Sequence, residues 1–191
     1  MTRSREADEL GDVQPCIPRQ SAGEQGARRP DGTDLDARFG EELAPVVTGA
    51  RRRAVRDGDR QIDTAHLLHS LIEYDPEARA VLGEGPQVAR LLGYLVQRSI
   101  GYGLRWQSTV EDSGAVPVVT GAAGFSPLAA TAMEGARARA VRRGADRPTG
   151  VDLLAALVTD PQARAVEVLG RAAVEPRTVL ARVENHFEPT P

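Results

Sequence analysis

Histidines are the residues of this chain that come closest to a metal-binding pattern. His66 and His69 lie three residues apart, so both project from one face of a helix, where two metal ligands can sit side by side. A third ligand is not in sight, because His186 is distant in sequence and Asp152 belongs to a different part of the chain. We therefore predict that His66 is a semi-buried helix residue and that the chain holds no metal.

Nucleophilic or phosphate chemistry has even less support. The single cysteine, Cys16, has neither a base nor a fixed cationic neighbour that would activate its thiol. There is no G-x-S-x-G motif, no paired carboxylates with a pocket signature and no glycine-rich phosphate loop. All 24 basic residues are Arg, whereas the phosphate-binding loop G-x-x-x-x-G-K-[ST] requires a Lys. The sequence predicts a protein that is not an enzyme and uses no cofactor.

Charge and hydropathy also restrict the partners. A formal net charge of −3 over 191 residues leaves no electrostatic footprint for nucleic acid or an anionic membrane. No apolar run approaches a membrane span and no signal peptide is evident, so we expect a cytoplasmic protein. Two Arg-rich stretches favour solvated helix faces, with a docking surface for acidic partners as the alternative. They comprise Arg51, Arg52, Arg53 and Arg56, and Arg137, Arg139, Arg142 and Arg143.

The elements that position these residues come from a duplication. The heptapeptide 75–81 returns as 160–166 with a single substitution. The offset between the copies is 86 residues from Phe39 and Phe125 up to the Leu-Leu pairs, and 85 residues after them. One residue is therefore missing from the second copy, in the turn before Asp160. A duplicated unit of this size is a structural module that packs against its own copy.

Caps, glycines and apolar periods divide each copy into four helices. An apolar period of three or four residues starts at Phe39, and Gly58 is placed to end that helix. Thr64 or Asp63 can cap the second helix, and the Asp-Pro pair at 75–76 is a strong start signal for the third. The corresponding signals of the second copy are Pro127, Gly144, Thr149 and the Asp-Pro pair at 160–161.

The predicted fold is all-α, with two pseudo-twofold-related repeats of four helices and a disordered N-terminal arm. Leu68 and Leu154 should be equivalent core positions, because each follows a cap by one turn and continues an apolar stripe. The arm is rich in Gly, Pro and charge and has no sustained apolar period. The predicted bounds are 1–36 for the arm and 37–187 for the helical domain, with repeat one at 37–100, a connector at 101–124 and repeat two at 125–187.

Short motifs recur at the same place in both copies. Phe39 and Phe125 open them, the second followed by Ser-Pro; Thr-Ala-His-Leu-Leu stands at 64–68 and Gly-Val-Asp-Leu-Leu at 150–154. In this order and spacing the chain resembles, over about residues 37–187, the double-repeat Clp N-terminal domain of ClpA/ClpC-type Hsp100 unfoldases. Each repeat of that family opens with Phe-Thr and later shows Gly-Thr-Glu-His-Leu-Leu. The resemblance implies a substrate- and adaptor-docking module without the ATPase motor, whose phosphate loop a Lys-free chain cannot carry.

Some members of that family hold phospho-arginine in two pockets. Those pockets use the Thr after each opening Phe and the Glu before each His-Leu-Leu. Here the four positions are Gly40 and Ala65 in the first copy, and Ser126 and Val151 in the second. Both carboxylates that would pair with a guanidinium are gone, so we do not expect this recognition to be inherited.

The expected function is a non-catalytic binding protein that docks peptides, adaptors or small ligands and modulates a ClpC-type unfoldase system. Sequestration of a natural-product antibiotic, such as a cyclic peptide aimed at the unfoldase, is an alternative. A peptidase lacks a nucleophile–base pair, and a helical DNA-binding regulator is disfavoured by charge.

The ligand surface is predicted near the start of the second repeat, which keeps an aromatic residue, a hydroxyl and a helix start together. Phe39 and Phe125 are predicted to pack in the core or between the repeats, with a mixed role for Phe125. The candidate residues are Phe125, Ser126, Leu128, Ala129, Arg137 and Phe39.

Overall fold

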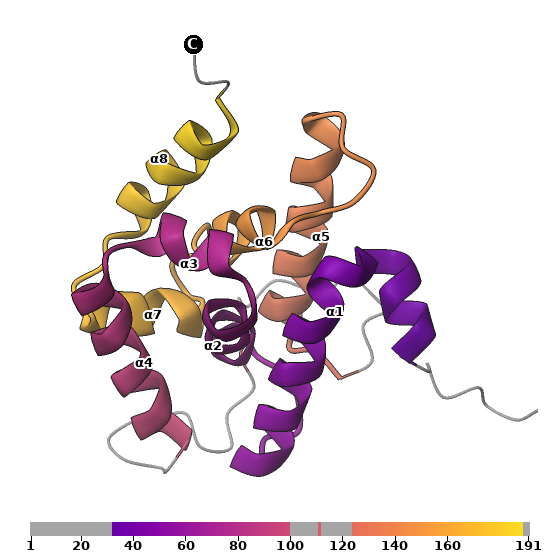
Figure 1. Cartoon of the computed structure of the whole chain (residues 1–191). Coiled ribbons are helices and arrows are strands. Elements are labelled where there is room, and N and C mark those ends of the chain that lie inside the picture. The colour runs from indigo at the N-terminus through magenta and orange to yellow at the C-terminus, as the bar shows by residue number, and fades with distance from the viewer. Residues whose placement is uncertain (1–31, 100–110, 112–123, 189–191) are drawn as a thin grey trace, which may run out of the picture.

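The computed structural model describes residues 32–99, 111 and 124–188. In this part of the chain eight α-helices and one isolated β-bridge form the whole secondary structure (Figure 1). The helices are α1 (Gly32–Asp57), α2 (Thr64–Tyr74), α3 (Pro76–Leu82), α4 (Gly85–Ser99), α5 (Pro127–Arg142), α6 (Gly150–Leu157), α7 (Arg164–Arg171) and α8 (Pro176–Phe187). None of them combines the length and the apolar composition that a bilayer-spanning helix needs. The all-α prediction with four helices per repeat is confirmed.

Helix α1 is two helical segments joined at Gly40. This residue has φ 81° and ψ 166°, a conformation that costs glycine little and other residues more. A Cβ at Gly40 would also approach Arg147 Cδ to 3.0 Å. The segment before the kink begins at Gly32, so the last residues of the predicted arm are helical. Residues 1–31 of that arm, and all of the predicted connector except Glu111 and Gly124, lie outside the described residues.

The first helices of the two repeats end in the same way. Gly58 and Gly144 follow α1 and α5 with φ of 75° and 76°, in the left-handed region that glycine tolerates best. Asp63, one of the two predicted candidates, caps α2, and Asp75 caps α3 with Pro76 in the first turn. Thr149 caps α6 as predicted.

The prediction that the Asp-Pro pair at 160–161 starts a helix is wrong. Instead of a helix at Pro161, the chain makes a turn and α7 begins only at Arg164, with Ala163 at its N-cap. Asp160 Oδ1 accepts from the backbone N–H of Gln162 at 2.8 Å, two residues on, and so closes a local turn. The free amide of Arg164 is satisfied elsewhere, by the carboxylate of Glu111.

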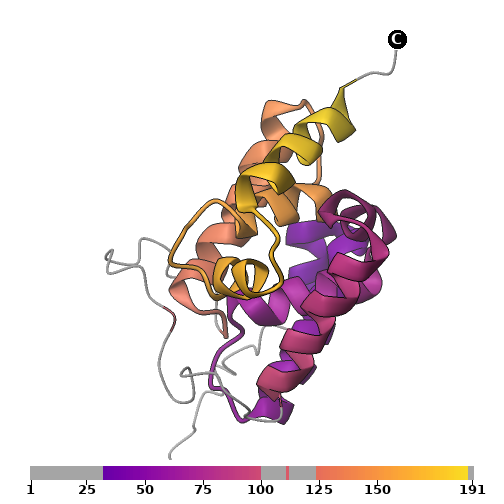
Figure 2. The same ribbon diagram turned by 90° about the vertical axis from the view of Figure 1, so that its left-hand side faces the viewer.

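The two repeats pack reciprocally. Within each repeat the first helix lies along the second, α1 on α2 and α5 on α6. Between repeats, α3 packs against α6 and α8, and α7 packs in return against α2 and α4. Figures 1 and 2 show α2 and α6 in the middle of the molecule with the other helices around them. Leu68 on α2 and Leu154 on α6 are buried to 0% and 1% exposure, which confirms their predicted equivalence.

Candidate functional site

A groove runs along one face of α5. Its volume is about 510 Å³, and it is bounded by α5, the end of α6 and the turn before α7. We call it the α5 groove. The residues that line it are Thr64, Leu128, Thr131, Ala132, Gly135, Ala138, Arg139, Arg142, Ala156, Leu157, Thr159, Asp160, Pro161 and Ala163. Volumes between about 300 and 1,000 Å³ are typical of pockets that hold small molecules.

The chemistry of the α5 groove is mostly apolar with polar groups around it. The side chains that line it on α5 and α6 are mostly small, and Gly135 lies so close to α6 that an added Cβ would come within 3.3 Å of Ala156 Cβ. Arg139 and Arg142 bring positive charge to one end. Arg139 donates to Glu184 at 2.8 Å, whereas Arg142 is exposed and forms no ion pair within the described ranges 32–99, 111 and 124–188. Asp160 also lines the groove, so it is the end with the two arginines that suits an acidic group beside an apolar one.

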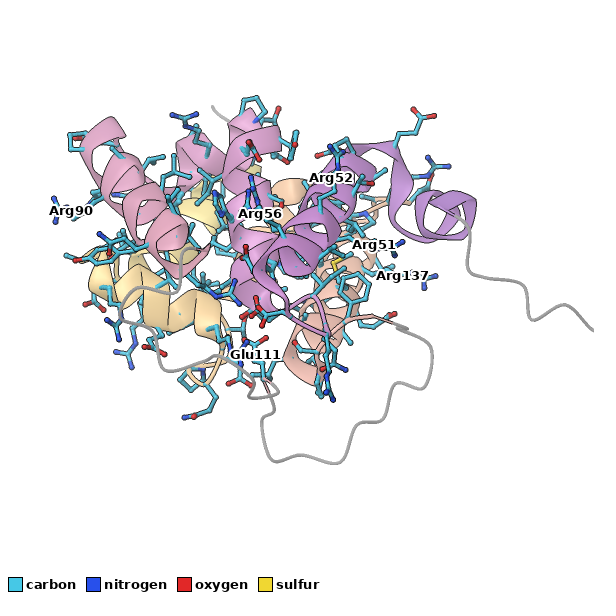
Figure 3. All side chains as sticks on the ribbon, turned by 90° about the horizontal axis from the view of Figure 1, so that it is seen from below. Arg51, Arg52, Arg56, Arg90, Glu111 and Arg137 are labelled. Carbon is cyan, nitrogen blue, oxygen red and sulfur yellow. The ribbon has the colours of Figure 1, made fainter. Side chains whose placement is uncertain are left out.

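Of the predicted ligand residues, Leu128 lines the α5 groove. Ala129 is buried in the core, and Arg137 is exposed on a part of α5 that does not line the groove (Figure 3). Phe125 is buried and sits in a parallel bridge with Ile62, through bonds from Ile62 N to Gly124 O (2.6 Å) and from Ser126 N to Ile62 O (2.8 Å). The side chain of Phe39 lies outside the described residues.

Ser126 and Thr64 meet at a buried carboxylate that sequence reasoning missed. Glu111 Oε2 accepts from Thr64 N at 2.9 Å and from Ser126 Oγ at 2.8 Å. Its Oε1 accepts from Arg164 N at 2.7 Å and from the hydroxyl of Thr64. Figure 3 labels Glu111 at this meeting point of α2, α5 and α7.

These four donors satisfy the Glu111 carboxylate in full, so the buried charge is stabilised by charge-assisted bonds and by the starts of two helices. The hydroxyl of Ser126, predicted to be available to a ligand, is already donated to Glu111. The second repeat has a simpler counterpart, in which the exposed Glu42 accepts from Gly150 N at 3.2 Å.

A second polar cluster surrounds the cap of α2. Arg164 Nη1 donates to Asp63 Oδ2 at 2.6 Å, and Arg98 donates to the same carboxylate. Burial acts to raise the pKa of Asp63, but its hydrogen bonds with His66 and the charge of Arg98 outweigh burial and hold the pKa well below its usual range. Asp63 is therefore ionised throughout the physiological range.

The same cluster contains the group of residues that is closest to a metal site. Ligand atoms of Asp59, Asp63 and His66 lie within 4.8 Å of one another. The guanidinium of Arg98 donates to Asp59 Oδ2 at 3.0 Å and also to Asp63, and that of Arg164 donates to Asp63. Two cations of the chain itself thus neutralise the carboxylates that a metal would need. His69, the other predicted candidate, does not join the cluster.

His69 makes stability depend on pH. Burial, with the charges of Arg53 and Arg56, lowers the pKa of His69 from 6.5 to about 4. Between pH 6.5 and about pH 4, His69 is protonated in the unfolded chain but neutral in the folded chain. The free energy of unfolding therefore falls as the pH is lowered. Between pH 7 and pH 5 we expect a loss of about 2 kcal/mol in the free energy of unfolding from this residue.

Urea denaturation of wild type and His69→Gln at the two pH values measures this contribution. The variant has no imidazole to titrate, so its loss between pH 7 and pH 5 should be smaller by about 2 kcal/mol. An equal pH dependence in the two proteins would show that His69 is not held neutral by the fold.

Solved structures of other proteins share this architecture. The N-terminal domain of the caseinolytic protease associated chaperone ClpD from Arabidopsis thaliana aligns with a TM-score of 0.59 at 21% identity, over 81% of this chain and 97% of that one. A chain from preliminary structural investigations of a malarial protein secretion system gives a TM-score of 0.56 at 15% identity, over 80% and 97%. No protein-family model and no curated protein matches the chain. The fold is that of a Clp N-terminal domain, as the sequence motifs predicted.

Proposed function

We propose that this chain is a non-catalytic docking protein that binds peptides or adaptors in the α5 groove and thereby modulates a ClpC-type unfoldase system. The α5 groove carries the proposal, because it is an open and largely apolar site with cationic groups at one end. It lies on a fold that a protease-associated chaperone also carries at its N-terminus. Such a groove can hold an extended or cyclic peptide by apolar contact, with polar groups fixing its orientation.

The mode of action follows from mass action. A docking protein that binds the same adaptor or substrate as an unfoldase removes that ligand from the motor in proportion to its concentration and affinity. Such a competitor slows degradation without any chemistry of its own. The purified chain is accordingly expected to hydrolyse neither ATP nor casein.

Natural-product sequestration is the second candidate, and the apolar lining of the α5 groove favours it. A cyclic peptide is pre-organised and loses little conformational entropy on binding. The chain would then protect an unfoldase from an antibiotic rather than compete for its adaptor. One measurement distinguishes the two candidates. A competitor for the adaptor slows adaptor-dependent degradation in the absence of any antibiotic, whereas a protein that only sequesters the antibiotic does not.

Adaptor-dependent degradation by a purified ClpC-type unfoldase and its protease tests the proposal. With the chain in molar excess over the adaptor, we expect the degradation rate to fall. Ala138→Glu places a charge in the α5 groove and should abolish this inhibition. Val141→Glu makes the same change at an exposed position of α5 outside the groove and should inhibit like wild type.

Two results would count against the proposal. Degradation that is unaffected at every ratio excludes competition for the adaptor. Equal inhibition by wild type and Ala138→Glu places the docking surface elsewhere, and loss of inhibition in Arg137→Glu alone would place it on the exposed part of α5 that does not line the groove.

A further inference from the structure

We infer that the α5 groove takes an acidic residue followed by an aromatic residue from a partner peptide, seated as repeat one seats its own Glu73 and Tyr74. The inference rests on the proposed docking function and names the chemistry of the ligand. It comes from a difference between the two repeats at one place, where repeat one holds a dipeptide that repeat two lacks.

In repeat one, Tyr74 lies directly on the backbone of α1. A Cβ added to Gly49 would come within 2.5 Å of Tyr74 Cε2 and 3.2 Å of Tyr74 Cδ2. The glycine thus provides a seat for the aromatic ring. Ser70 forms the other side of the seat, with its Oγ 3.0 Å from the same added Cβ. Tyr74 remains 44% exposed, so it covers this part of α1 from the solvent side.

Glu73 fixes the dipeptide at a second point. Its carboxylate accepts from Arg53, one turn along α1 from Gly49, in an ion pair between the two helices. The aromatic ring and the acid are thus held by a glycine and an arginine four residues apart on one helix face.

Repeat two keeps the two receiving residues. At the offset of 86 residues, Gly49 corresponds to Gly135 and Arg53 to Arg139, and both line the α5 groove. The dipeptide that these two residues hold in repeat one is absent from repeat two. Thr159 stands in place of Glu73, and Tyr74 has no counterpart, because this is the site of the residue missing from the second copy. The α5 groove is the space that this loss leaves open.

Charge at the end of the α5 groove fits the acidic half of the ligand. Arg142 is exposed and offers an unpaired guanidinium within the part of the chain that the structure describes. Arg139 has the buried Asp152 4.0 Å from its Nε, but its Nη2 pairs with Glu184, whose side chain is 61% exposed, and a pair with so exposed a partner contributes little. A carboxylate from a peptide can therefore meet Arg142, or replace Glu184 on Arg139, at small cost.

A peptide with the chain's own sequence 70–77, Ser-Leu-Ile-Glu-Tyr-Asp-Pro-Glu, is the probe. Labelled with a fluorophore, it is titrated with the full chain and its polarisation is followed. Replacing its Tyr by Ala, or the Glu directly before that Tyr by Gln, is expected to weaken binding. The loss should be about tenfold or more for the aromatic residue, because buried aromatic anchors dominate such interfaces. Equal affinities for the three peptides would overturn the inference.

The decisive variant gives repeat two the dipeptide that repeat one has. Thr159→Glu with a Tyr inserted after it restores the missing dipeptide, which should occupy the α5 groove from within and abolish peptide binding while the fold is retained. Ala138→Trp fills the groove by a different route and is expected to have the same effect if the insertion disturbs folding. Val141→Trp, exposed on α5 outside the groove, is the matched control and should bind like wild type. Unchanged binding by Ala138→Trp would place the peptide elsewhere.

The inference and the proposed function fail in different ways. If the chain slows adaptor-dependent degradation but the peptide neither binds nor competes, the groove takes another ligand and only the inference is lost. If the peptide binds with the expected dependence on Tyr and Glu but degradation is unaffected, the inference stands and the unfoldase role is lost.

Discussion

Replacing Glu111 by Ala is expected to lower the free energy of unfolding by about 3–5 kcal/mol. The substitution leaves the amides of Thr64 and Arg164 and the hydroxyls of Thr64 and Ser126 without their acceptor. All three residues are buried, and a buried donor without a partner costs the desolvation of that group. Urea denaturation of the two proteins measures the loss.

Glu42→Ala is the matched control. Glu42 also accepts from the first residue of a helix, Gly150, but it makes this one bond from an exposed position. Its removal should cost less than about 1 kcal/mol, since exposed interactions contribute little. If Glu111→Ala cost no more than Glu42→Ala, water would be replacing the carboxylate and the cluster would not hold the repeats together.

Leu68→Ala and Leu154→Ala should each lower the free energy of unfolding by about 2–5 kcal/mol. Both side chains are essentially inaccessible to solvent, on the two central helices. Truncation removes the buried methyl groups and leaves a cavity that close-packed neighbours fill only in part. Because the two positions are equivalent in the duplicated fold, the two losses should be similar in size.

Val55→Ala and Val141→Ala provide the control pair. They too are equivalent positions of the two repeats, but they are 76% and 66% exposed. Their truncation should change stability by no more than about 0.5 kcal/mol. A loss below about 1 kcal/mol at both leucines would mean that the core lies elsewhere.

Local signals in the sequence predicted most of the fold. The glycines at 58 and 144, the cap at Thr149 and the Asp-Pro pair at 75–76 act through contacts within a few residues, so a single sequence reveals them. The Asp-Pro pair at 160–161 shows the limit of this reasoning. The same two residues form a turn there, and α7 begins only at Arg164, whose backbone N–H is bound by the distant carboxylate of Glu111.

Glu111 itself could not have been found in the sequence. Its partners lie 47, 15 and 53 residues away, and it stands in a glycine-rich segment with no periodicity to indicate burial. The origin of the α5 groove could be predicted in part from the sequence. The missing residue before Asp160 was visible in the alignment of the two copies, but its consequence depends on where Tyr74 packs, which only the tertiary structure shows.

Each repeat packs its third helix against the second helix of the other repeat, and this arrangement indicates how such a chain can arise. A single copy of the repeat would leave part of the surface of its second helix exposed, because in the full protein the third helix of the other copy covers that part. Two separate copies could cover each other about a twofold axis, as in a symmetric homodimer with one self-complementary contact surface. Joining them end to end makes that association intramolecular and independent of concentration. It also frees each half to change alone, and the loss of one residue from the second half is a change that no symmetric dimer could have confined to one side.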